Sequence, residues 1–177
     1  MRFSIIIFVI CIGTSCSPLK PVLKNDVDNI NTHDLNQLNG DYQIFSTDSS
    51  SLTLPSALLL DRRYNYWDLT DSNDWISLKL IDSNRIEISL YDNGVLVKKK
   101  IRKGKLENNY FEFKRNVKIK FRFILNGIFE NEVRIRLGQN GDLIVDENGS
   151  STACLIIIPV GGAKSDFYGV RFERKKQ

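Results

Sequence analysis

The strongest constraint on the fold is a strict alternation of apolar and polar residues in four separate stretches. Residues 76–80, 86–90, 117–123 and 133–137 each carry an apolar side chain at every second position. Because successive side chains of a strand point to opposite faces, each stretch predicts a β-strand with one buried face and one solvated face. The chain of 177 residues is therefore expected to be all-β.

Turn signals separate these stretches and set the order of the strands. We predict further strands at 42–46, 95–102, 110–114, 143–146, 155–158 and 167–173. Five Asn-Gly pairs occur, and they begin at Asn39, Asn93, Asn126, Asn140 and Asn148. Asn-Gly tolerates the positive φ angles of tight hairpins, so several of these pairs predict antiparallel connections. About ten short strands in this order predict a single antiparallel up-and-down β-barrel, with a β-sandwich as the alternative.

The amino terminus has the pattern of a targeting segment. Arg2 is followed by an apolar run over residues 3–12, which ends in the small residues Gly13, Thr14 and Ser15 before Cys16. This charged, apolar and small-residue order is typical of a secretory signal peptide, and the run is shorter than the roughly 20 residues of a spanning helix. We therefore expect residues 1–15 to be a signal peptide and the protein to be exported.

Residues 12–16 resemble the lipobox of bacterial lipoproteins, in which Ser15 would be the small residue before the cut. The resemblance implies that Cys16 becomes the first residue of the mature chain and carries a thioether-linked diacylglycerol and a further acyl chain such as palmitate. Two or three acyl chains anchor a protein stably. The expected location is a bacterial membrane, most simply the outer membrane. The alternatives are ordinary signal-peptide cleavage with a free Cys16, or a buried helix.

The mature chain is expected to have a tether and one domain. Residues 16–31 contain Pro18, Pro21 and several Asn and Asp residues, which predicts a flexible tether. Residues 32–38 predict a short helical turn, and the β-barrel domain then covers 32–177. The exception to alternation is 52–74, which predicts either a short helix beginning near Pro55 or a long loop across an open end of the barrel.

The start of the first strand resembles the lipocalin superfamily. Gly40-Asp41-Tyr42 follows the helical turn, where lipocalins have a G-x-W motif, and Arg171 or Arg174 could supply the late arginine that packs over the aromatic ring. The lipobox, the tether, 103–113 and 136–145 are together similar to small surface lipoproteins of Bacteroidetes-type bacteria. This resemblance implies a lipocalin-like barrel and no particular activity.

A lipocalin-like barrel implies a binding site for one small apolar ligand or lipid. The residues expected to line the interior are Leu78, Ile88, Phe111, Phe113, Phe121, Phe123 and Ile135. The alternative is that the same side chains fill the interior and leave no room for a ligand.

Charge is distributed unevenly along the chain. Acidic residues dominate over 16–84, whereas lysines and arginines outnumber acids by more than two to one over 85–136. We predict one basic patch on the outer face of two adjacent strands, formed by Lys118, Lys120, Arg122, Arg134 and Arg136. Such a patch could meet an anionic envelope component or an acidic partner, and the alternative is an ordinary solvated face. Export argues against nucleic acid as a partner.

The sequence offers little for catalysis or metal binding. Three cysteines and one histidine exclude zinc fingers, thiol-redox pairs and a disulfide scaffold, and Cys154 is expected to be a buried core residue. Asp68, Asp71 and Asp74 lack the glycine and closing glutamate of a calcium loop. We predict a monomeric non-enzymatic protein with no catalytic residue, metal or cofactor. A hydrolase is the third hypothesis, after a ligand-binding barrel and a filled barrel that acts through its surface.

Overall fold

The computed structural model describes residues 32–48, 50–59, 73–120, 125–138, 140–155 and 158–175. Its strands form one antiparallel nine-stranded sheet, which confirms the all-β prediction. The predicted signal peptide, Cys16 and the predicted tether lie outside the described residues, and so do Asp68 and Asp71.

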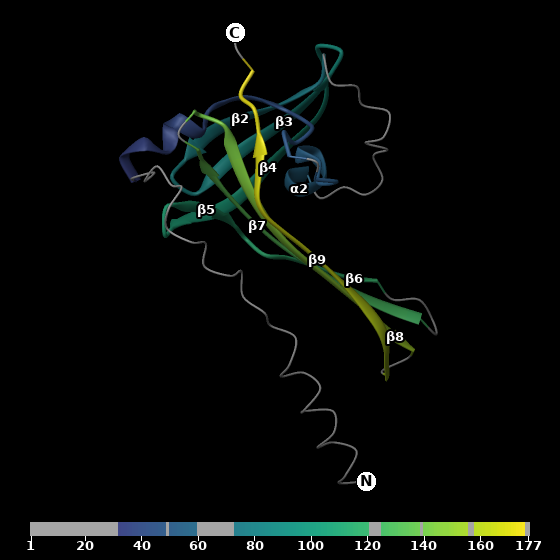
Figure 1. Ribbon diagram of the computed structural model, residues 1–177. Coiled ribbons are helices and arrows are strands. Elements are labelled where there is room, and N and C mark those ends of the chain that lie inside the picture. Colours follow the sequence, from purple (N-terminus) through teal and green to yellow (C-terminus); the bar gives the residue numbers. More distant parts are fainter. Residues whose placement is uncertain are drawn as a thin grey trace.

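The elements follow one another almost entirely as neighbouring strands (Figure 1). In chain order they are the 3-10 helix η2 (Thr32–Leu38), β1 (Gly40–Gln43), helix α2 (Leu54–Leu59), β2 (Trp75–Asp82), β3 (Arg85–Asp92), β4 (Val95–Glu107), β5 (Tyr110–Phe113), β6 (Asn116–Lys120), β7 (Leu125–Leu137), β8 (Leu143–Leu155) and β9 (Ile158–Phe172). The order in the sheet is β1-β2-β3-β4-β5-β7-β8-β9, and β6 pairs with β7.

The two ends of the sheet meet through a few backbone hydrogen bonds, among them one from the N–H of Thr47 to the carbonyl oxygen of Arg171 at 3.0 Å. Just after β9, the backbone N–H of Gln43 donates to the carbonyl oxygen of Glu173 at 2.9 Å, and that of Lys175 donates to Asp41 at 2.8 Å. These bonds make an isolated bridge between Tyr42 and Arg174 and not a strand pairing of β1 with β9. The sheet is therefore open within the described residues, and barrel closure is not confirmed.

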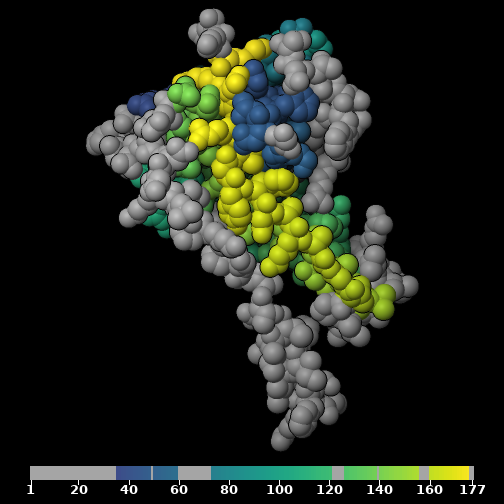
Figure 2. All heavy atoms as spheres, in the orientation of Figure 1, coloured from purple at the N-terminus to yellow at the C-terminus, as the bar shows by residue number. Residues whose placement is uncertain are grey.

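Part of the sheet projects from the body as a narrow ribbon (Figures 1 and 2). We call this ribbon the tongue. It consists of β6 with residues 125–132 of β7, 147–155 of β8 and 158–167 of β9. Its strands stay paired over their whole length, with Asn116–Lys120 beside β7 and Leu125–Leu137 beside β8.

Two of the five Asn-Gly pairs lie inside strands of the tongue and do not form hairpin turns. Asn126-Gly127 and Asn148-Gly149 lie inside β7 and β8, where Gly127 is opposite Ala153 and Gly149 is opposite Ser165. A Cβ atom on Gly149 would lie 2.6 Å from the Ser165 Oγ, so glycine permits a close cross-strand approach here. The expected turn does form at Asn93-Gly94, where φ is 49° and 80°.

The core lies on one face of the curved sheet and includes the short helix. Alternate residues of β2, β3, β5, β7, β8 and β9 share one apolar cluster, and Leu54, Ala57, Leu58 and Leu59 of α2 belong to that same cluster. Residues 54–59 are therefore a helix, as one of the two sequence alternatives predicted, and this helix packs into the core.

Candidate functional site

Five of the predicted interior residues do lie in the core. Leu78, Ile88, Phe111, Phe113 and Ile135 are each at most 5% exposed and belong to the single apolar cluster. Phe111 and Phe113 meet edge to face, with ring centroids 5.2 Å apart. The other two predicted members, Phe121 and Phe123, lie outside the described residues.

Helix α2 is held on this core face by two basic side chains of β4. Lys100 and Arg102 pair with Ile88 and Ile86, so all four side chains share the inner face of the sheet. The Lys100 Nζ donates to the carbonyl oxygen of Leu59 at 2.8 Å. The Arg102 Nη1 donates to the carbonyl oxygens of Ala57 and Leu58 at 3.3 and 3.2 Å, which satisfies groups that a helix C-terminus leaves open.

Arg102 is a buried cation, which disfavours its charged form, and its hydrogen bonds attach helix α2 to β4. Its guanidinium lies 4.2 Å from the centroid of the Phe113 ring, a cation–π contact. Burial lowers the pKa of Arg102 to about 10, although the nearby Glu147 carboxylate acts in the opposite direction. No sequence signal indicates this role, because Lys98, Lys100 and Arg102 look like the solvated positions of an alternating strand.

A set of close contacts joins Gly40, Tyr42 and Arg174 where the ends of the sheet meet. The Arg174 guanidinium lies 5.6 Å from the centroid of the Tyr42 ring. Its Nη2 donates to the carbonyl oxygens of Gln37, at 3.1 Å, and Asn39. A Cβ atom on Gly40 would lie 2.6 Å from two guanidinium nitrogens of Arg174, so glycine is needed for the contact. Of the two arginines considered from the sequence, Arg174 is the one over the ring.

Because Tyr42 is buried, we predict that the protein loses stability at alkaline pH. Burial raises the pKa of Tyr42 to about 12, with Arg174 acting in the opposite direction. Because a tyrosine in the unfolded chain ionises near pH 10, the stability that neutral Tyr42 contributes is complete below pH 10 and is lost as the pH rises to about 12. The expected loss is about 2–3 kcal/mol in the free energy of unfolding.

Urea denaturation between pH 9 and pH 12 measures this loss. The pH dependence should be weaker in Tyr42→Phe, which has no phenol to ionise, and unchanged in Tyr168→Phe, whose ring is exposed. Equal pH dependence in the wild type and Tyr42→Phe would contradict the assignment.

The predicted basic patch does not form on one exposed face. Arg134 and Arg136 are only 5% and 3% exposed. Lys118 pairs with Phe129, whereas Val117 pairs with Glu130, so the register puts Lys118 and Lys120 on the face opposite to that of Arg134. The predicted patch requires both strands to present their basic residues on one face of the sheet. The observed register instead puts them on opposite faces. Arg122 lies outside the described residues.

Arg134 takes part in a buried ion pair. Its Nε donates to the Asp146 Oδ2 at 2.8 Å, and the Asp146 Oδ1 accepts from the backbone N–H of Gly169 at 2.7 Å. The guanidinium groups of Arg134 and Arg136 lie 4.2 and 5.2 Å from the centroid of the Tyr110 ring. Burial also raises the pKa of Tyr110. This cluster links β5, β7, β8 and β9 and therefore has a structural role.

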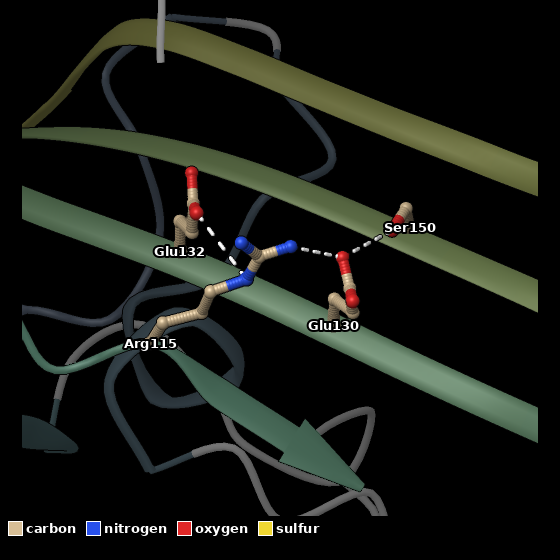
Figure 3. A network of polar contacts seen from close by, with 4 residues as sticks. All are labelled: Arg115, Glu130, Glu132 and Ser150. Carbon is tan, nitrogen blue, oxygen red and sulfur yellow. Dashed lines mark hydrogen bonds and ion pairs between the residues drawn. The ribbon is translucent and has the colours of Figure 1, made fainter. Parts of the chain in front are cut away.

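A second polar network marks the place where the tongue leaves the body (Figure 3). Arg115, between β5 and β6, points between two carboxylates of β7. Its Nη2 contacts Glu130, and its Nε lies 3.4 Å from the Glu132 Oε1. The Ser150 Oγ on β8 donates to Glu130 at 3.5 Å.

A groove of about 570 Å³ lies beside this network, between β4, β5 and β7. Its basic residues are Lys103, Lys105, Lys114 and Arg115. The rest of the lining is Gly104, Glu112, Phe113, Glu132 and Val133, so a small molecule there would meet both charges and an apolar surface.

The remaining polar candidates have ordinary surroundings. Across the described ranges, no group of three or more His, Cys, Asp or Glu side chains is placed to hold a metal ion. Asp74 is buried and accepts a hydrogen bond from the backbone N–H of Asn93 at 2.8 Å, which stabilises the β3–β4 turn. Cys154 is partly exposed and lies outside the apolar cluster, so the prediction that it is a buried core residue is wrong. No helix in the described part of the chain is long and apolar enough to cross a bilayer.

Comparison of the chain with protein-family models, curated proteins and solved structures finds no match.

Proposed function

We propose that this protein is an exported, lipid-anchored bacterial lipoprotein whose lipocalin-like body acts through its outer surface and not through a ligand in its interior. The observation that carries the proposal is the position of α2. Leu54, Leu58 and Leu59 are at most 1% exposed and share one core with Leu78 and Ile88, which the sequence had suggested as ligand contacts. The helix thus occupies space that a lipocalin ligand would need.

The membrane location is supported by the amino-terminal sequence. An apolar run followed by Gly13-Thr14-Ser15-Cys16 fits export and acylation at Cys16. On this proposal, the body is a stably folded domain that lies near a membrane surface. The tongue is the part of the sheet that projects from this domain.

A second candidate function is suggested by the groove between β4 and β7. Its lysines, together with Phe113 and Val133, would suit a small amphipathic acid with an anionic head and an apolar tail. Such a ligand would bind outside the core, so this candidate needs no internal cavity.

The anchor is tested by replacing Cys16 with alanine in the full chain. Wild-type protein should partition into the detergent phase of a Triton X-114 extraction, and Cys16→Ala should move to the aqueous phase. Cys154→Ala is the matched control, because it removes a thiol from β8 in the tongue and leaves the acylation site intact. Retention of Cys16→Ala in the detergent phase would contradict the anchor.

The occupancy of the interior is tested by native mass spectrometry of the purified full chain. A filled core should give the mass of the acylated chain without an additional apolar molecule. A co-purified lipid that stays bound in Lys103→Gln would place a ligand in the interior and overturn the proposal. A co-purified acid that is lost in Lys103→Gln but kept in Lys79→Gln would favour the groove instead.

A further inference from the structure

The distal half of the tongue combines exposed apolar side chains with an unusual charge pattern. This distal half comprises residues 117–120, 125–129, 151–155 and 158–164. Its exposed apolar residues, each at least 36% accessible, are Val117, Ile119, Ile128, Leu155 and Val160. Its charged residues are Lys118, Lys120 and Lys164, and these ranges contain no aspartate or glutamate.

The strand register sorts these residues onto two faces. Ile119 lies directly opposite Ile128, and Val117 is two residues away on the same face. Lys118 and Lys120 lie on the other face, where the Lys120 Nζ is 5.4 Å from the centroid of the Phe129 ring. Lys164 pairs with Ser150, which pairs with Glu130, so Lys164 shares the face of Val117 and Ile119. Leu155 lies two residues after Ala153, which pairs with Gly127, so it shares the face of Lys120. Both faces of the distal half therefore combine exposed apolar side chains with lysines.

The carboxylates of the tongue are confined to its proximal half. Glu130 and Glu132 contact Arg115 at the junction with the body, as Figure 3 shows. Glu147 and Asp166 lie on β8 and β9, also outside the distal half. The tongue thus changes from an acidic half beside the body to a basic and apolar distal half.

We propose that the distal half of the tongue inserts into the interface of an anionic lipid bilayer. This inference rests on the proposed membrane location of the protein. At roughly 3.4 Å per residue, the five residues 125–129 extend about 17 Å, and interfacial segments bury themselves by about 5–10 Å. The exposed apolar side chains would contact the acyl-chain boundary, and the lysines would meet lipid phosphates.

Charge complementarity favours an anionic bilayer over a second copy of the chain. Two distal halves placed side by side would bring two sets of lysines together with no carboxylate to oppose them. Lipid phosphates supply the missing negative charge, and the exposed β-branched side chains gain an apolar environment.

Tryptophan quenching by brominated lipids tests the insertion in the full, anchored chain. Ile119→Trp reports on the tongue, and Ile101→Trp is the matched control because both isoleucines are 52% exposed and only Ile101 lies on the body. In vesicles of phosphatidylcholine with phosphatidylglycerol, the fluorescence added by Ile119→Trp should be quenched several-fold more than that added by Ile101→Trp. Lys118→Gln combined with Lys120→Gln, or high salt, should reduce this difference.

Three outcomes would overturn the inference. The first two are equal quenching in both variants and no quenching in Ile119→Trp. The third is a blue-shifted emission of Ile119→Trp without lipid together with dimer formation, which would indicate a second copy of the chain.

The insertion test is separate from the test of the anchor. An anchored chain whose Ile119→Trp fluorescence is not quenched contradicts only the insertion. Detergent-phase partitioning of Cys16→Ala contradicts only the anchor.

Discussion

Replacing Asp146 by alanine should lower the free energy of unfolding by about 3–5 kcal/mol, because it leaves the Arg134 guanidinium buried without its carboxylate. Asp146 is fully buried and accepts from both Arg134 and the backbone N–H of Gly169. Its removal therefore weakens two contacts at once. One is between β7 and β8, and the other attaches β9 at Gly169. Urea denaturation at pH 7 measures the loss.

The matched control for this ion pair is exposed. Asp82 and Arg85 also form an ion pair, but their side chains are 40% and 48% exposed, and Asp82 in addition accepts a turn hydrogen bond from the backbone N–H of Asn84. Asp82→Ala should therefore cost much less stability than Asp146→Ala. Arg134→Met combined with Asp146→Leu should cost less than Asp146→Ala alone, since it leaves no unpaired charge. If Asp146→Ala destabilises no more than Asp82→Ala, the buried pair has no special role.

Replacing Leu58 by alanine should lower the free energy of unfolding by about 2–5 kcal/mol. Leu58 is fully buried in the apolar cluster, so truncation removes its contacts and leaves a cavity beneath α2. The cavity should also admit small apolar molecules, since cavities with apolar linings stay dry and bind such ligands. Thermal denaturation with and without benzene measures both effects.

Leu96→Ala is the control, because Leu96 is 47% exposed and its truncation should change stability by at most about 0.5 kcal/mol. A Leu58→Ala protein as stable as Leu96→Ala would mean that α2 is not an integral part of the core. The description of the interior as filled would then be wrong.

Alternation predicted the strands of the body well, because those strands have one buried face. Ile76, Leu78, Ile86 and Ile88 are all at most 2% exposed, as a period of two requires. The strands of the tongue were missed over most of 125–132, 147–155 and 158–166. Their hydrogen bonds come from neighbouring strands, and no buried face imposes an apolar period on them.

The candidate site was less predictable than the fold. Five interior residues were identified correctly as core residues, since burial leaves a periodic signal. Arg134 and Arg136 were expected at the surface, but Asp146 and Tyr110 lie far enough away in sequence that their pairing depends on register. The role of Arg102 in holding α2 likewise depends on where residues 54–59 fold back onto β4.

By itself, the sequence determined the all-β class, the positions of most body strands, the Gly40-Asp41-Tyr42 start and the expectation of an export signal. These features are local, because period, turn residues and targeting segments can be recognised within a few positions. Only the tertiary structure decided that Arg174 packs on Tyr42, that α2 occupies the core and that β6–β9 extend as a tongue. Those results depend on which distant segments pair and in which register, and a one-residue change of register would move every side chain to the other face.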